Sequence, residues 1–249
     1  MEERSSRRRS EAEIYHVYSR GVGKQIVYET DKDRNVFCKV MRETLAESEL
    51  ELYAWCLMDN HFHLLMHGSI DAISDFMKLL LSQYARYFNS EHGRQGHVFQ
   101  SRFGSEPIDS ESYLLNAVRY IHQNPEKAVL APTDRYRWSS YQEYVHVSKI
   151  TTTAPLMRGF GTVAAFEVFH RRYSRFSLRE YDDGKGAAMA KRALAIAIDE
   201  LGEQGFMNLR SLPMAERNSR IKRLANRGLS IRQIERLTGV NRNSISRIV

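Results

Sequence analysis

Two histidines separated by one residue are the side chains best suited to hold a metal ion. His61 and His63 lie in an apolar run typical of a β-strand, so both imidazoles project from one face, roughly 7 Å apart at Cα. Two imidazoles on one face can bind a divalent cation if a third ligand comes from elsewhere. Packing or surface chemistry also produces this pattern, so the pair alone decides nothing.

A tyrosine and an asparagine later in the chain could complete such a site. Tyr120 and Asn124 are four residues apart on a predicted helix, so they are neighbours at the edge of its apolar stripe. A deprotonated phenol attacks phosphorus, and a metal ion can polarise the phosphate. The combination therefore indicates phosphoryl transfer. The structural alternatives are a boundary aromatic for Tyr120 and a helix-ending residue for Asn124.

A sheet and a helix must meet for these residues to converge. The periodicity predicts strands at 14–19, 52–58 and 61–66, and helices at 31–48, 73–88 and from about 109 to 124. Asp59 and Asn60 form a tight turn between two strands, and Pro125 ends the last helix at Asn124. This order predicts an α+β fold, a ferredoxin-like antiparallel sheet with the helices on one face.

Length and composition bound the class of protein. The chain has 249 residues, of which 42% are hydrophobic and 27% charged, as in globular proteins of one or two domains. No apolar run would span a membrane, the N-terminus lacks a secretory signal, and Cys38 and Cys56 make no disulfide framework. We therefore expect a cytoplasmic protein without membrane partners. The predicted domains are 1–147 (catalytic), 148–185 (linker and helical extension) and 186–249.

The last domain is strongly basic. The segment from residue 206 onward contains ten Lys or Arg residues and only two Glu residues, and the net charge of the whole chain is +7. Helices at 216–226, after Ser230 and after Asn241, with a turn at Gly239, predict an all-α helix-turn-helix module that binds DNA. The side chains expected to contact bases and phosphates are Asn241, Arg242, Asn243, Ser246 and Arg247. A helical bundle for protein contacts is the alternative.

A loop in the first domain combines cations with aromatic rings. Cations can contact phosphates while rings stack on unpaired bases. The candidate DNA-binding residues are Arg94, His97, Phe99 and Arg102, with Arg20 at the end of the first strand. The alternative is an ordinary surface loop anchored by Phe99 and Phe103.

Four short motifs resemble a known family. They are AWCLMDNHFHLL at 54–65, GHVFQSRF at 96–103, RYIHQNP at 119–125 and WSSY at 138–141. In this order and spacing, over roughly residues 14–144, the chain resembles the single-tyrosine transposases of the HUH endonuclease superfamily. Within that superfamily it is most similar to the REP-associated tyrosine transposases of bacteria, which are IS200-like.

The resemblance implies a mechanism. His61 and His63 would be ligands of Mg²⁺ or Mn²⁺, and Asn124 would take the third-ligand position, where relatives often carry Gln. Tyr120 would attack single-stranded DNA to give a 5′-phosphotyrosine and a free 3′-hydroxyl. The implied partner is single-stranded DNA with hairpin or palindromic repeats, and monomer and homodimer both remain open. Imidazole ligands by themselves would instead favour zinc and later transition metals.

Two other functions compete with a DNA-nicking and strand-transfer enzyme. A non-enzymatic helix-turn-helix regulator would bind duplex DNA without using Tyr120. A metal-dependent hydrolase of small phosphoesters would need no DNA. The basic tail and the missing cluster of Asp and Glu residues around His61 disfavour this hydrolase.

Overall fold

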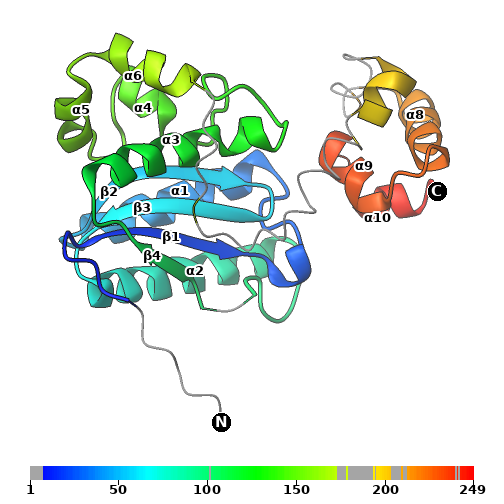
Figure 1. The fold of residues 1–249 in the computed structure, drawn as a ribbon. Helices are drawn as coiled ribbons and strands as arrows, with labels where there is room; N and C mark the ends of the chain where they lie inside the picture. Colours follow the sequence, from blue (N-terminus) through cyan, green and yellow to red (C-terminus); the bar gives the residue numbers. More distant parts are fainter. Residues whose placement is uncertain are drawn as a thin grey trace. The chain divides into compact units, whose positions relative to one another are not determined.

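A computed structural model describes residues 8–100, 102–172, 178, 193, 195–202, 209, 212–238, 240 and 242–249 (Figure 1). The chain divides into two units, Met1–Glu126 with Ala131–Tyr181, and Lys127–Leu130 with Asp182–Val249. Within the described residues, no helix is both long enough and apolar enough to cross a membrane. Each unit is described by itself.

A four-stranded antiparallel sheet forms the centre of the first unit. Its strands are β1 (Ile14–Arg20), β2 (Glu51–Met58), β3 (His61–His67) and β4 (Gly104–Pro107), in the order β2-β3-β1-β4. With helix α1 (Asp31–Ala46) after β1 and α2 (Ile70–Glu91) after β3, the order is that of a ferredoxin-like βαββαβ unit. The three predicted strands and the Asp59-Asn60 turn are confirmed.

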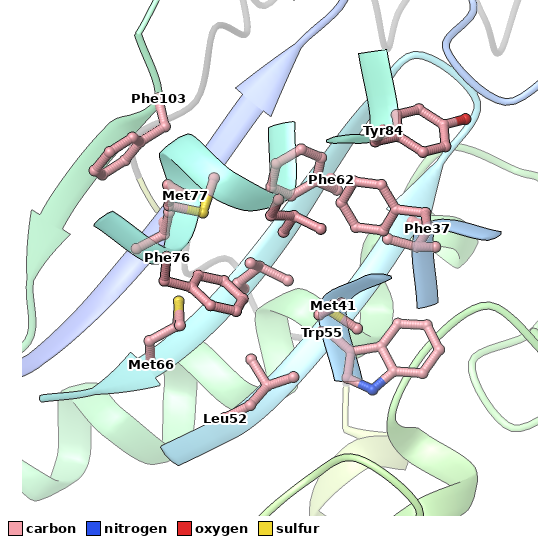
Figure 2. Packing of buried hydrophobic residues seen from close by; sticks show 14 of the residues in the cluster. Phe37, Met41, Leu52, Trp55, Phe62, Met66, Phe76, Met77, Tyr84 and Phe103 are labelled. Carbon is pink, nitrogen blue, oxygen red and sulfur yellow. The ribbon is translucent and has the colours of Figure 1, made fainter. Parts of the chain in front are cut away.

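Helices α1 and α2 cover one face of the sheet. Leu57, Phe62 and Leu64 project to this face, and Phe62 contacts Phe37 of α1 with ring centroids 5.1 Å apart. Figure 2 shows these aromatic and aliphatic side chains packed between the strands and the two helices. This layer is the main hydrophobic core and holds the sheet rigid.

Helix α3 (Glu111–Lys127) lies on the opposite face. Tyr120 of α3 contacts His63, which points away from Phe62 because successive strand residues alternate in direction. The prediction that all helices pack on one face is therefore wrong for α3. The physical reason is that β2 and β3 are buried along nearly their whole length on both faces, so both faces need cover.

The ends of two helices differ from the prediction. Thr30 caps α1, in a reciprocal capping box with Asp33, so Asp31 is the first helical residue and not the cap. Helix α3 continues past Asn124 to Lys127, with Pro125 inside its last turn. A proline there removes one hydrogen bond near the helix end, and the buried residues around it keep the turn helical.

Three short helices complete the first unit: α4 (Tyr141–Val145), α5 (Ala154–Phe160) and α6 (Val163–Arg171). The segment that precedes α5 is not an open linker as predicted. Glu143 accepts hydrogen bonds from the backbone NH groups of residues 149–151 at 2.8–2.9 Å, and the Thr152 NH donates to the Leu52 carbonyl of β2 at 2.7 Å. The bonds to Glu143 hold the segment against α4, and the bond to Leu52 holds it against β2.

The second unit is helical in its described residues. Helices α8 (Met214–Asn226), α9 (Ile231–Thr238) and α10 (Arg242–Ser246) pack around a small apolar cluster. Gly228 follows α8 with φ +86°, as its predicted C-terminal position requires, and Ser230 caps α9 together with Gln233. The predicted turn residue Gly239 and the predicted cap Asn241 lie outside the described residues.

Candidate active site

The α3-facing side of the sheet carries a row of polar and aromatic side chains. In the β1–β3 register Arg20 lies opposite His61 and Tyr18 lies opposite His63. Residues directly opposite each other in an antiparallel pair share a face. The two predicted ligands and the predicted phosphate contact Arg20 therefore lie side by side, and the ring centroids of His61 and His63 are 5.0 Å apart with perpendicular planes.

The hydrogen bonds of Asn60 set the tautomer of His61. The Asn60 amide nitrogen donates to the Lys24 carbonyl at 3.1 Å, which turns its Oδ1 towards His61. Because Oδ1 only accepts, the His61 Nδ1 at 2.7 Å must carry the ring proton. The Nε2 of neutral His61 is then the nitrogen with the lone pair, the form that binds metal ions.

A third histidine contacts His63. His16 of β1 is fully buried and its Nε2 lies 2.9 Å from the Nδ1 of His63. Burial, and next the neighbouring His63, lower the pKa of His16 well below its ordinary value, so His16 is neutral and its Nε2 can accept a hydrogen bond from His63 Nδ1. In that arrangement both His61 and His63 present Nε2 as the lone-pair nitrogen.

Helix α3 brings Tyr120 to the histidines. The ring centroids of Tyr120 and His63 are 6.1 Å apart and their planes are nearly perpendicular. Tyr120 is 5% exposed, and Asn124, one helical turn further on, is 7% exposed. The structure therefore brings His61, His63 and Tyr120 together and places Asn124 on the Tyr120 side of α3.

The described residues contain no group of three or more His, Cys, Asp or Glu side chains arranged to hold a metal ion. His61 and His63 supply two such ligands, and Asn124 belongs to another residue type. A metal held by this pair would need an amide, water or phosphate oxygen to complete its coordination.

The loop between α2 and β4 is only partly available for DNA. Phe99 is buried and packs on Phe62 and Tyr84, as in the alternative in which it anchors the loop, while its stacking on a base stays a prediction. The aromatic core under α2 takes up the ring. Arg94 contacts Gln25 and Glu29 and lies over the Phe88 ring. The predicted DNA contacts His97 and Arg102 are exposed.

In the second unit, Ser246 and Arg247 of the predicted DNA-binding set are exposed. Arg242 is half-buried; its backbone NH donates to Glu235 and its guanidinium is 3.5 Å from the same carboxylate. Asn241 and the side chain of Asn243 lie outside the described part of the chain.

Sequence reasoning missed three side-chain roles. The sequence predicts Asn60 only as a turn residue and indicates no role for His16. The third is a buried chain through His122, Ser140 and His170 behind α3. The alternation of β1 was a signal for His16, whereas the partners of Asn60 and His122 lie far apart in sequence.

Part of the chain matches the model of a known protein family. The family model described as "Transposase IS200 like" matches residues 12–124, a range that contains His61, His63, Tyr120 and Asn124. No curated protein is significantly similar to the chain.

Two solved structures are similar to this one. A REP-associated tyrosine transposase bound to a REP hairpin has 16% identity and a TM-score of 0.49, over 57% of this chain and 85% of that chain. A candidate transposase from Deinococcus radiodurans has 21% identity and a TM-score of 0.34, over 49% and 96%. Both TM-scores are below 0.5, so neither of these two similarities carries an argument about this chain.

Proposed function

We propose that the protein is a metal-dependent transposase that cuts and rejoins single-stranded DNA through Tyr120, and the match of residues 12–124 to the family model described as "Transposase IS200 like" supports this proposal. The substrate we propose is a single strand next to a hairpin or palindromic repeat. The observation that carries the proposal is the meeting of Tyr120 with His61 and His63 on one face of the sheet.

The proposed step is an in-line displacement at phosphorus. The Tyr120 oxygen, having lost its proton, forms a bond to phosphorus while the bond from phosphorus to the 3′ oxygen breaks. The departing 3′ oxygen takes up a proton and becomes a free hydroxyl. The 5′-phosphate of the downstream strand stays on the tyrosine until an incoming 3′-hydroxyl reverses the reaction, which is strand transfer.

The histidine tautomers support a metal ligand role. Two imidazoles that each have Nδ1 hydrogen-bonded to a neighbour leave Nε2 as the nitrogen for a divalent metal. His61 and His63 would hold Mg²⁺ or Mn²⁺, with Asn124 as the proposed third protein ligand. A bound cation would offset the charge that develops on the phosphate oxygens.

We assign the C-terminal unit to helix-turn-helix DNA binding. Ser246, the last residue of α10, and the following Arg247 are exposed on a unit that is rich in basic residues. This unit would bind the duplex stem of the substrate while the first unit cuts the adjacent single strand. Phosphate contacts of this kind depend strongly on salt concentration.

A labelled oligonucleotide tests the enzymatic proposal. Incubation of the protein with Mn²⁺ and a 3′-labelled single strand carrying its own flanking repeat should give a protein-linked label that survives denaturation. Tyr120→Phe should abolish the label because it removes the attacking oxygen. Tyr113→Phe, which changes a tyrosine on the same helix bonded to Glu106, should keep it.

The competing regulator predicts the opposite pattern. Sequence-preferring duplex binding, indifferent to chelators and to Tyr120→Phe and without any covalent label, would replace the transposase proposal with a non-enzymatic function.

A further inference from the structure

Behind α3, on the side away from the candidate site, a chain of hydrogen bonds connects the sheet to α6. The Trp55 backbone NH donates to Ser140 Oγ at 2.9 Å, and Ser140 Oγ lies 2.7 Å from His122 Nε2. His122 Nδ1 lies 3.0 Å from His170 Nε2, and His170 Nδ1 lies 2.9 Å from the Phe166 carbonyl. All three linking side chains are at most 3% exposed.

The direction of every bond in this chain is determined. Burial first, and Arg119 in addition, lower the pKa of His170 to about 4, so its ring carries one proton. The Phe166 carbonyl only accepts, so His170 has its proton on Nδ1 and accepts at Nε2. His122 must then donate from Nδ1 and accept at Nε2.

Ser140 completes the chain at the sheet. Its hydroxyl donates to His122 Nε2 and accepts from the Trp55 NH. The Trp55 carbonyl is a poorer acceptor for this hydroxyl, because it is 3.3 Å away and already accepts from the Ser140 NH at 2.9 Å. Four hydrogen bonds in series therefore run from the backbone of β2 to the backbone of α6.

This chain acts on the turn of α3 that carries the proposed nucleophile. His122 lies between Tyr120 and Asn124, and its neighbour Gln123 donates to the His170 carbonyl at 2.7 Å, on the same side as His122. Arg119 lies over the Phe169 ring of α6 at 4.2 Å. Tyr120 faces the sheet while the residues around it are fixed to α6.

The other end of the chain is adjacent to the histidine strand. Trp55 precedes Cys56, which lies opposite His63 in the β2–β3 register. The hydrogen bonds of Ser140 and His122 thus connect α3 to Trp55 of β2. Trp55 is the neighbour of the residue that pairs with His63. The distance between Tyr120 and His63 depends on this attachment.

We infer that His122 and His170 are positioning residues that hold Tyr120 at the distance from His63 needed for attack on DNA. The inference rests on the proposed function for its catalytic part, whereas the hydrogen-bond chain itself can be tested without DNA. Misplacement of a reacting group by about 1 Å can reduce a rate about 100-fold.

The first experiment measures the tautomers in the full-length protein without DNA. Two-dimensional proton–nitrogen correlation of ¹⁵N-histidine protein, assigned with His122→Gln and His170→Gln, should show both rings protonated at Nδ1. Solution imidazole favours the Nε2-protonated form, so this pair is a distinctive signature. Protonation at Nε2 in either ring would contradict the proposed series of hydrogen bonds, whether or not the protein cuts DNA.

The second experiment uses two variants of similar volume. His170→Gln keeps an acceptor for His122 Nδ1, whereas His170→Met has none. With saturating oligonucleotide, we expect His170→Met to form the covalent adduct about tenfold to 100-fold more slowly, with unchanged DNA affinity, and His170→Gln to recover most of the rate.

The outcomes separate the inference from the proposed function. If His170→Met is folded, judged by its thermal transition, and reacts at the wild-type rate, the positioning role is wrong. Equal slowing of the Gln and Met variants would also overturn it, because the acceptor would then be irrelevant. If the wild-type protein forms no adduct at all, the proposed function fails, and with it the catalytic part of this inference.

Discussion

Each histidine of the proposed metal site has its ring held by a neighbour of a different kind. Asn60 accepts from His61, and its amide is itself held by the Lys24 carbonyl. His63 bonds to His16, a buried imidazole on the adjacent strand. Partners of this type orient the ligand and increase its basicity, so they contribute to metal affinity without touching the metal.

Replacement of His16 tests this contribution. His16→Met removes the hydrogen-bond partner of His63 Nδ1, and we expect it to weaken Mn²⁺ binding about tenfold to 100-fold. His16→Gln places an amide oxygen near the lost Nε2 and should remain closer to the wild-type affinity. Titration of the full-length protein with Mn²⁺, monitored by the electron paramagnetic resonance signal of the free ion, measures the affinity of both variants. Wild-type affinity in a folded His16→Met protein would contradict the role.

The residue types of the site are predictable from sequence because their spacing is local. His61 and His63 share a face by alternation, and Tyr120 and Asn124 by helical periodicity. The contact of His16 with His63 depends on the β1–β3 register, which joins residues 47 positions apart. Periodicity within one strand cannot specify which strand lies beside it.

At the scale of elements, α3 is held from two directions. It packs on the sheet through the Tyr120 side, and its opposite side packs on α6 through His122 and Arg119. A helix fixed in this way can carry a reactive side chain at a constant distance from a strand. The buried imidazoles that fix it are neutral, which makes the attachment sensitive to acid.

Acid should destabilise the first unit through His170. Burial first, and Arg119 in addition, lower its pKa from 6.5 to about 4, although the Phe166 carbonyl opposes the shift. The unfolded chain therefore binds more protons, so the stabilisation is complete above pH 6.5 and is lost as the pH falls towards 4. The loss from this group amounts to about 3 kcal/mol.

Urea unfolding at about pH 7 and about pH 4.5 measures this dependence. His170→Gln removes the titrating ring, so its free energy of unfolding should fall less over the same interval. His122, which faces His170, and His16 contribute to the remaining dependence because burial lowers the pKa of both, and so do the hydrogen-bonded carboxylates of Asp33 and Glu143, whose pKa values are also lowered. An identical acid dependence in wild type and His170→Gln would contradict the assignment.

The elements that the sequence analysis missed are short or atypical. Strand β4 has four residues, begins with Gly104 and ends with Pro107, so it carries no alternating pattern. Its position at the sheet edge, paired only with β1, tolerates proline. The extension of α3 through Pro125 was missed because local preference disfavours it, whereas the buried packing of that turn supports it.

At the scale of the whole molecule, basic residues of the second unit differ in their surroundings. Arg223 and Arg227 are bound to Asp199 and Glu200, acidic residues that precede the strongly basic segment. Arg247 is exposed and makes none of the ion pairs seen among the described residues. Net charge alone therefore overstates the number of cations available to DNA.

This difference gives a matched pair of variants. Arg247→Gln should weaken binding to a hairpin oligonucleotide and reduce the slope of log affinity against log salt by about 0.9, the effect of one lost phosphate contact. Arg227→Gln should leave the slope unchanged, because two carboxylates already hold that guanidinium. Equal slopes for wild type and Arg247→Gln would remove Arg247 from the proposed interface.

The layer arrangement could be predicted only in part. The ferredoxin-like order and the α1–α2 layer follow from the succession of strands and helices. The second layer formed by α3 requires the knowledge that both faces of β2 and β3 are buried. Their near-continuous apolar runs, such as Leu52–Met58, are a signal of two-sided burial that alternation alone does not give.

The identity of the attacking residue is the central claim, and mass spectrometry of the covalent adduct tests it most directly. After reaction with Mn²⁺ and the single-stranded oligonucleotide, nuclease and protease digestion should leave one peptide whose mass is increased by a nucleotide attached through its 5′-phosphate. We expect the fragment ions to show that the added nucleotide is attached to Tyr120. A mass on Tyr18 or Tyr113, or an adduct through a histidine, would contradict it.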